Sequence, residues 1–167
     1  CVSTMRSTSG LSLCVRGPNS CFPVAGVSKT QSCVSHSTPE AETVAMDFAL
    51  RHNGLPSLTL WERLLPHSPG LYVHEDNQAI IRVVAIGKNP TMRHLGRTHG
   101  VSISWMNQET SRPSIWLRYI ETSLMAADIF TKHYSSKKKN VWASVRQNIN
   151  VLTPEEVGDV VGRPGLG

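Results

Sequence analysis

The chain has 167 residues, of which 40% are hydrophobic and 17% are charged, and its net charge is +5. This length suits a single domain with a tail, and the composition is neither that of a disordered chain nor that of a membrane protein. The longest apolar runs fall far short of the ~20 residues of a membrane-spanning helix, and the N-terminus lacks the pattern of a secretory signal peptide. The pI of about 9.3 permits a polyanionic partner but does not require one.

The four cysteines lie early in the chain, at Cys1, Cys14, Cys21 and Cys33. None belongs to a Cys-x-x-Cys pair, and no pair of histidines has zinc-finger spacing. We therefore interpret the cysteines as reduced intracellular thiols rather than as disulfides or metal ligands. Because the chain begins with Cys1 and not with Met, we expect it to be a fragment of a longer protein.

A β-hairpin is predicted near the N-terminus, after an irregular basic segment at residues 1–10. Residues 11–15 alternate between apolar and polar with period two, which is typical of a strand. The Gly-Pro-Asn-Ser sequence at 17–20 predicts a turn, and the apolar residues 21–27 predict the returning strand.

Two helical segments are predicted next. Ser37-x-x-Glu40 matches a capping box, Pro39 suits a first helical position, and apolar residues recur at helical spacing through 41–49. We expect residues 53–56 to break this helix and Ser57 to cap a second helical piece. Four apolar residues of that piece are predicted to face inward: Leu58, Trp61, Leu64 and Leu65.

A short apolar run at 71–73 ends in charged and amide residues, and a second apolar run follows at 79–86. The pattern predicts a buried strand that passes into a helix, which should end near Gly87. In open α/β sheets, catalytic groups lie at the carboxyl ends of strands, where Asp76 is expected. Alternatively, Asp76 only caps the helix that begins near Asn77.

The second half begins with a basic stretch at 88–99. Residues 101–105 alternate like a strand, although a helix is possible, and residues 115–120 are typical of a strand. Thr122 or Ser123 can cap a helix that ends near Tyr134.

Beyond that helix, the spacing of apolar residues at 141–149 indicates one more short helix. The lysines at 137–139 are expected to face solvent. Residues 153–167 are rich in glycine and proline, and we expect them to be disordered.

Three acidic residues stand at element boundaries or early in helices: Glu42, Asp76 and Asp128. Converging carboxylates could hold a pair of Mg²⁺ ions that activate water for phosphodiester cleavage. Helical geometry alone does not choose between Glu40 and Glu42, but Glu40 already has a use in the capping box. Asp128 could instead form a surface ion pair with Lys132, four residues later.

Six short motifs carry a resemblance to a known family. They occur in the order Arg6-Ser7-Thr8-Ser9-Gly10, Ser28-Lys29-Thr30-Gln31, Ser37-Thr38-Pro39-Glu40-Ala41-Glu42, Glu75-Asp76-Asn77-Gln78, Lys88-Asn89-Pro90 and Ala127-Asp128-Ile129-Phe130-Thr131-Lys132. With these motifs, residues 1–134 resemble the C-terminal ribonuclease H domain of copia-type retrotransposon polyproteins. The resemblance implies an α/β fold with a ribonuclease H-like mixed sheet, and metal-dependent hydrolysis of the RNA strand of RNA–DNA hybrids.

The resemblance also implies a site. Its Ala-Glu-x-x-Ala, Asp-Asn-Gln and Ala-Asp-Ile-Phe-Thr-Lys patterns select Glu42, Asp76 and Asp128 as catalytic, metal-binding carboxylates for two Mg²⁺ or Mn²⁺ ions. Asp128 would then lie on the last helix of the domain and face the sheet instead of pairing with Lys132. The family's first catalytic Asp, with its strand, would precede Cys1, so we expect an incomplete site and impaired activity.

Contacts with an RNA–DNA hybrid would be directed mostly at phosphates and groove shape. Candidates for these contacts are Arg82, Lys88, Arg93 and Arg97. Alternatively, these residues form only a solvated basic face. The family's basic His-x-Arg-Thr-Lys-His stretch is altered at residues 94–100, and the family places a helix near 100–108, which we adopt over the strand.

We therefore expect a ribonuclease H-like domain at 1–135 without its first strand, a helical extension at 136–152 and a disordered tail at 153–167. The expected partners are the hybrid and the upstream reverse transcriptase portion of the same polyprotein, with no membrane. The life cycle of such an element implies an intracellular location, in cytoplasmic virus-like particles or the nucleus. The alternative hypothesis is a degenerate, non-catalytic nucleic-acid-binding or interaction module.

Overall fold

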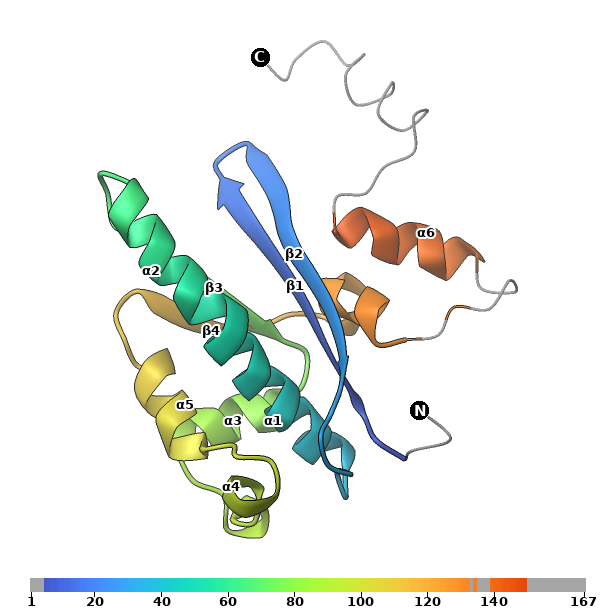
Figure 1. Cartoon of the computed structure of the whole chain (residues 1–167). Helices are drawn as coiled ribbons and strands as arrows, with labels where there is room; N and C mark the ends of the chain where they lie inside the picture. The colour runs from blue at the N-terminus through green and yellow to red at the C-terminus, as the bar shows by residue number, and fades with distance from the viewer. Residues whose placement is uncertain (1–4, 133, 135–138, 150–167) are drawn as a thin grey trace.

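The computed structural model describes residues 5–132, 134 and 139–149, which form a mixed α/β structure (Figure 1). Their strands form two separate two-stranded sheets, one antiparallel and one parallel. The predicted α/β class is therefore confirmed. The expected tail at 153–167 and the lysines at 137 and 138 lie outside the described residues.

The N-terminal hairpin pairs β1 (Thr8–Gly17) with β2 (Ser20–Thr30). It closes at the predicted turn, and both strands extend several residues beyond the alternating segments in the sequence. The register shifts between Leu13 and Cys14, which is the irregularity of a β-bulge. The hairpin was thus predicted correctly in kind, while its length was underestimated.

The second sheet pairs β3 (Leu71–Glu75) with β4 (Ile115–Tyr119) in parallel. Both strands were predicted at these positions. Parallel strands need a crossover connection, and here it contains three helices and a 3₁₀ turn (Figure 1). No hydrogen-bonded ladder joins the described strands of this sheet to those of the hairpin.

The predicted break at 53–56 is wrong. Helix α1 (Thr38–Ala49) continues through a π-helical turn, η1 (Leu50–Gly54), directly into α2 (Leu55–Leu64). In this turn the N–H of Leu55 bonds to the carbonyl of Leu50. The wider turn accommodates Pro56 at the start of α2, so the helix continues.

Two details of the predicted second helical piece fail with that break. Because Gly54 is itself helical, Ser57 has no free helix end to cap. The π-helical turn changes which residues of α2 face the same side as the apolar residues of α1. Leu64 is 63% exposed, whereas Leu58 is buried as expected.

Helix α3 (Gln78–Ile86) starts and ends where the sequence predicted. The Asn77 side chain caps it by accepting a hydrogen bond from the N–H of Ala79, at 2.9 Å. Gly87 ends it with a positive φ of 76°, a conformation that glycine adopts without strain. Because Asn77 is the cap, Asp76 is left free of that role.

In the stretch at 101–105 that alternates like a strand, residues 103–105 begin a helix, as the family resemblance implied. Helix α5 (Ile103–Thr110) is capped by Ser102, whose hydroxyl accepts from the N–H of Trp105. It follows α4 (Leu95–Thr98). Period-two alternation failed here because the side-chain cap outweighs it.

The helix predicted from residue 122 to 134 is replaced by two 3₁₀ helices, η3 (Thr122–Leu124) and η4 (Ala126–Phe130). Met125 is extended between them, with φ −70° and ψ 100°, and neither 3₁₀ helix has a side-chain cap. The last described helix is α6 (Lys139–Asn148), which confirms the short helix expected near 141–149.

The main core lies between the long helix and the α3–α5 segment. Its buried members come from α1, η1, α3 and the α4–α5 region: Met46, Leu50, Ile80, Val84, Leu95, Val101, Ile103 and Met106. The hairpin is attached beside this core through α1 and through η4 (Figure 1). Gly26 of the hairpin makes room for η4, because a Cβ there would lie 2.2 Å from the Phe130 ring.

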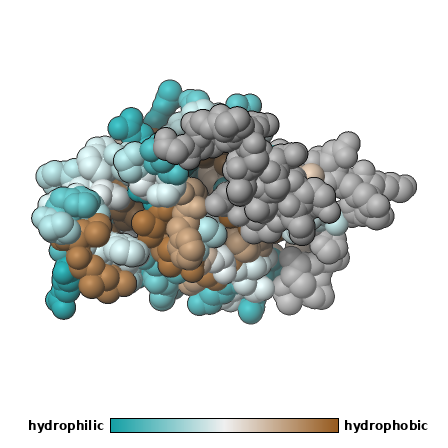
Figure 2. All heavy atoms as spheres, turned by 90° about the horizontal axis from the view of Figure 1, so that it is seen from above, coloured by the Kyte–Doolittle hydropathy of each residue, from teal (hydrophilic) through white to brown (hydrophobic). Residues whose placement is uncertain are grey.

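Apolar side chains also reach the surface. Figure 2 shows hydrophobic residues gathered in the middle of the face seen from above, with hydrophilic residues around them. The described chain exposes several large apolar side chains, among them Phe22, Val24, Leu60, Leu64 and Tyr72. None of the described helices combines the length and the apolar character that crossing a membrane requires.

Candidate metal site

A cavity of about 450 Å³ lies between the two sheets, with α1 and η4 completing its wall. The beginning of β1, the first turns of α1, the end of β3 and η4 all contribute lining residues. Gln31 helps hold β1 to α1, because its side-chain amide donates to Ser9 of β1 and to the carbonyl of Ala41 in α1. All three predicted carboxylates, Glu42, Asp76 and Asp128, line this cavity.

Glu42 projects from α1 toward the end of β3, where its carboxylate accepts a 2.6 Å hydrogen bond from the amide of Asn77. Burial raises the pKa of Glu42, and the negative charges of Asp76 and Asp128 raise it further against the effect of that hydrogen bond. Three segments far apart in the sequence therefore bring like charges close enough to interact.

Asp128 is placed differently from expectation. It lies on the 3₁₀ helix η4 and lines the cavity, but its carboxylate also forms an ion pair with Lys132. The prediction that Asp128 would avoid Lys132 is wrong. Lys132 lies four residues after Asp128 and its side chain is half exposed, so it can reach the carboxylate.

Glu75 is a fourth carboxylate in the cavity, and it was missed. It is the last residue of β3, only 9% exposed, and accepts a hydrogen bond from the N–H of Asn77. Burial, followed by the charges of Glu42 and Asp76, raises its pKa to about 7. Period-two alternation from Leu71 and Val73 puts Glu75 on the buried face, so the sequence carried this signal.

The carboxylates of the cavity do not form a compact set of metal ligands. Among the described residues, the group of three possible ligands whose donor atoms lie within 4.8 Å of one another is elsewhere, at His36, Glu40 and His94. The carboxylate oxygens of the cavity suit a hard cation such as Mg²⁺ chemically. Burial and, after it, the charges of neighbouring carboxylates raise the pKa values of Glu42 and Glu75, and a bound cation would offset both effects.

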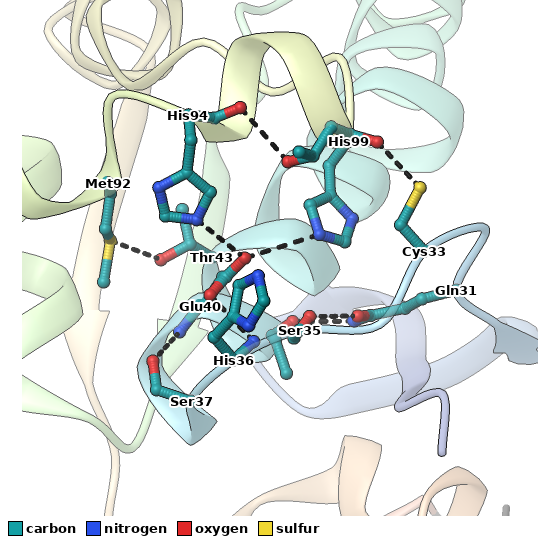
Figure 3. Close-up of polar contacts among 12 residues, drawn as sticks. Gln31, Cys33, Ser35, His36, Ser37, Glu40, Thr43, Met92, His94 and His99 are labelled. Atoms are coloured by element: carbon teal, nitrogen blue, oxygen red, sulfur yellow. Dashed lines mark hydrogen bonds and ion pairs between the residues drawn. The ribbon is translucent and has the colours of Figure 1, made fainter. Parts of the chain in front are cut away.

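The histidine cluster at the start of α1 was also missed, because its members are brought together only by the fold (Figure 3). Glu40 accepts hydrogen bonds from the backbone N–H of His36, at 2.9 Å, and from Nε2 of His94, at 3.1 Å. His99 Nε2 lies 3.5 Å from the same carboxylate. The cap itself is confirmed, since Ser37 accepts from the N–H of Glu40.

Burial opposes the negative charge of Glu40, but the hydrogen bonds from His36 and His94 prevail and lower its pKa below the ordinary value. Glu40 is therefore a carboxylate in this cluster, with a side chain only 3% exposed. Glu42, two residues later, points into the cavity, so the two glutamates serve different sites.

The four predicted nucleic-acid contacts are all exposed, on α3 and on the segment that follows it: Arg82, Lys88, Arg93 and Arg97. Their placement on one continuous segment is compatible with either a binding surface or a solvated face.

Comparisons with protein-family models, with curated proteins and with solved structures give no match.

Proposed function

We propose that this chain is a ribonuclease H-like domain of a copia-type retrotransposon polyprotein, whose reaction is metal-dependent hydrolysis of RNA in RNA–DNA hybrids and is impaired here. The observation that carries the proposal is the convergence of Glu42, Asp76 and Asp128 in one cavity. They come from α1, from the end of β3 and from η4, and three of the six ordered sequence motifs select the same three residues.

In this proposal Mg²⁺ supplies Lewis-acid activation of the phosphate and of the attacking water. The chain's own carboxylates provide the negative charge that holds the cation. Asn77 orients Glu42 through their 2.6 Å hydrogen bond. Glu75, with a pKa of about 7, can exchange a proton near neutral pH at the edge of the same cavity.

The exposed basic residues after α3 supply the other half of the proposal. Lys88, Arg93 and Arg97 can contact phosphates of a hybrid, as sequence-independent binding requires. The upstream reverse transcriptase portion of such a polyprotein would be the natural source of the hybrid, and the setting would be intracellular.

The test is cleavage of a labelled RNA–DNA hybrid by the purified chain in Mg²⁺ or Mn²⁺. We expect slow cleavage, because the cavity carboxylates do not form a compact ligand group and Asp128 is paired with Lys132. Asp76→Asn should lower the rate by about 100-fold, which corresponds to roughly 3 kcal/mol of transition-state stabilisation. Glu62→Gln, an exposed neutralisation on α2, should leave the rate unchanged.

Cleavage that is equal in the wild type and in Asp76→Asn would contradict a role for the cavity. A hybrid complex that weakens with salt but is indifferent to Mg²⁺ and to Glu42→Gln would instead favour the non-catalytic binding module. The ion pair between Asp128 and Lys132 is the observation on the side of that second candidate.

A further inference from the structure

A second potential metal site lies at the start of α1, outside the cavity. One donor atom each from His36, Glu40 and His94 lies within 4.8 Å of the other two. The three side chains come from the segment before α1, the first turn of α1 and the segment before α4 (Figure 3). We propose that they bind a divalent transition metal, with Zn²⁺ as the reference ion.

The donor atoms match this class of metal. Two imidazoles and one carboxylate are a ligand set that zinc adopts in sites with three protein ligands and one open position. His94 Nε2 and Glu40 Oε1 are 3.1 Å apart, a few tenths of an ångström less than the roughly 3.4 Å between neighbouring ligands around a tetrahedral zinc with bonds of about 2.1 Å. Mg²⁺ prefers oxygen ligands, so this site and the cavity select different ions.

A second observation points to the same place. The side chain of His99 is 0% exposed, and neither of its ring nitrogens has a hydrogen-bond partner. Buried polar groups are ordinarily paired, so this orphan needs a reason. Its Nε2 faces Glu40 Oε1 at 3.5 Å (Figure 3).

His99 is therefore a positioning residue for the carboxylate. Carboxylates that bind metals are themselves oriented by hydrogen bonds from neighbouring groups. A small movement of Glu40 on binding a metal can bring Oε1 within hydrogen-bond distance of His99. That movement would satisfy the buried nitrogen while the other face of the carboxylate meets the metal.

The competing explanation is a hydrogen-bond network between Glu40 and His94 that binds no metal. Substitution of His36 distinguishes the metal site from this network. The His36 ring is exposed and makes an edge contact with the His94 ring, with centroids 5.8 Å apart. The bond from His36 to Glu40 uses the backbone N–H, which any side chain at this position retains. Replacing the ring thus removes a metal ligand and leaves the network in place.

A metal here would join α1 to the segment that carries Lys88, Arg93 and Arg97. Because Glu42 belongs to the same helical turn as Glu40, the metal would also fix the basic segment relative to the cavity. Only this consequence for nucleic-acid binding rests on the proposed function; metal binding itself does not.

The experiment is calorimetric titration of ZnCl₂ into the chelator-treated full chain, in reducing buffer without Mg²⁺. We expect binding of one zinc per chain and a rise in Tm on adding zinc. His36→Ala should weaken the affinity at least tenfold and abolish the rise in Tm. His67→Ala, an exposed histidine in the turn before β3, and Asp76→Asn in the cavity should bind zinc like the wild type.

Cobalt serves as a second probe, because cysteines also bind zinc. Cys33 lies nearby, and its thiol donates a hydrogen bond to the carbonyl of Thr98. The Co²⁺ spectrum should show no thiolate-to-metal charge transfer. Zinc affinity unchanged in His36→Ala, binding lost on alkylating the cysteines, or no binding at all would each overturn the proposal. None of these outcomes depends on whether hybrid is cleaved.

Discussion

At the scale of single residues, burial and like charge both act on the cavity carboxylates. Burial raises the pKa of Glu42 and of Glu75, and neighbouring charges raise it further, from Asp76 and Asp128 on Glu42 and from Glu42 and Asp76 on Glu75. The sequence favoured Glu42 because Glu40 is used in the capping box and because the Ala-Glu-x-x-Ala pattern falls on Glu42. It did not reveal how strongly the neighbours would interact, since that depends on three segments meeting.

Glu75→Gln tests this electrostatic strain. The pKa of Glu75 rises from 4.5 to about 7 on folding, so the folded state binds the proton more tightly than the unfolded state does. The free energy of unfolding should therefore fall as the pH rises from about 4.5 to about 7, by an amount on the order of 2–3 kcal/mol from this group. Glu75→Gln should remove most of that fall, as measured by urea unfolding at pH 5 and pH 8.

The exposed Glu62→Gln is the matched control and should keep the pH dependence of the wild type. At pH 8, addition of Mg²⁺ should stabilise the wild type more than Glu75→Gln. A steep loss of stability with pH that persists in Glu75→Gln would show that the strain lies elsewhere.

At the scale of elements, local sequence signals predicted where helices and strands end, but not where a helix continues through a residue that usually breaks it. The Ser37 cap, the Asn77–Gly87 boundaries of α3 and the hairpin turn at 17–20 all follow from side-chain and backbone chemistry within a few residues. The helix through Leu50–Gly54 does not, because a π-turn anchored by the buried Leu50 overrides the Gly and Pro signals. The packing of Leu50 in the core therefore determines that the helix continues through this turn.

The packing of η4 against the hairpin gives a prediction at this scale. In Gly26→Ala the new Cβ would lie 2.2 Å from the Phe130 ring, so the ring or the strand must move. Overpacking of this kind costs about 1–3 kcal/mol. Urea unfolding should show this loss for Gly26→Ala and a clearly smaller one when Phe130→Leu is already present.

Gly96→Ala is the control, because the nearest atom to its new Cβ is 3.7 Å away and the residue is helical. It should be neutral or slightly stabilising. Equal costs of Gly26→Ala with and without Phe130 would mean that η4 does not rest on the hairpin as described.

At the scale of the whole molecule, the sequence predicted most strands and helices but not how they assemble. The strands β1, β2, β3 and β4 were each found by their apolar patterns. That they form two separate pairs, and that a cavity divides them, depends on contacts between distant segments. The same holds for the histidine cluster, where His94 and Glu40 are 54 residues apart in the sequence.

Residues of β1 and β3 line the cavity, and each of these strands has one edge without a strand partner among the described residues. Open edges are templates for pairing between chains. We expect concentration-dependent self-association, measured by sedimentation velocity under reducing conditions. Cys14→Lys, which puts a charge on the exposed part of the β1 edge, should reduce it, while Thr59→Lys on α2 adds the same charge and should not.

A wild-type chain that stays monomeric at all concentrations, or one that associates equally in Cys14→Lys and Thr59→Lys, would contradict this role for the edges.

The separation of the two sheets also has a consequence for the order of folding. The hairpin joins neighbours in the sequence, so closing it costs little chain entropy, whereas β3 and β4 must meet across three helices. The hairpin can therefore form early and dock late. The cavity lies on the seam between these two units, so the wall that β1 and β2 contribute is added only when the hairpin docks.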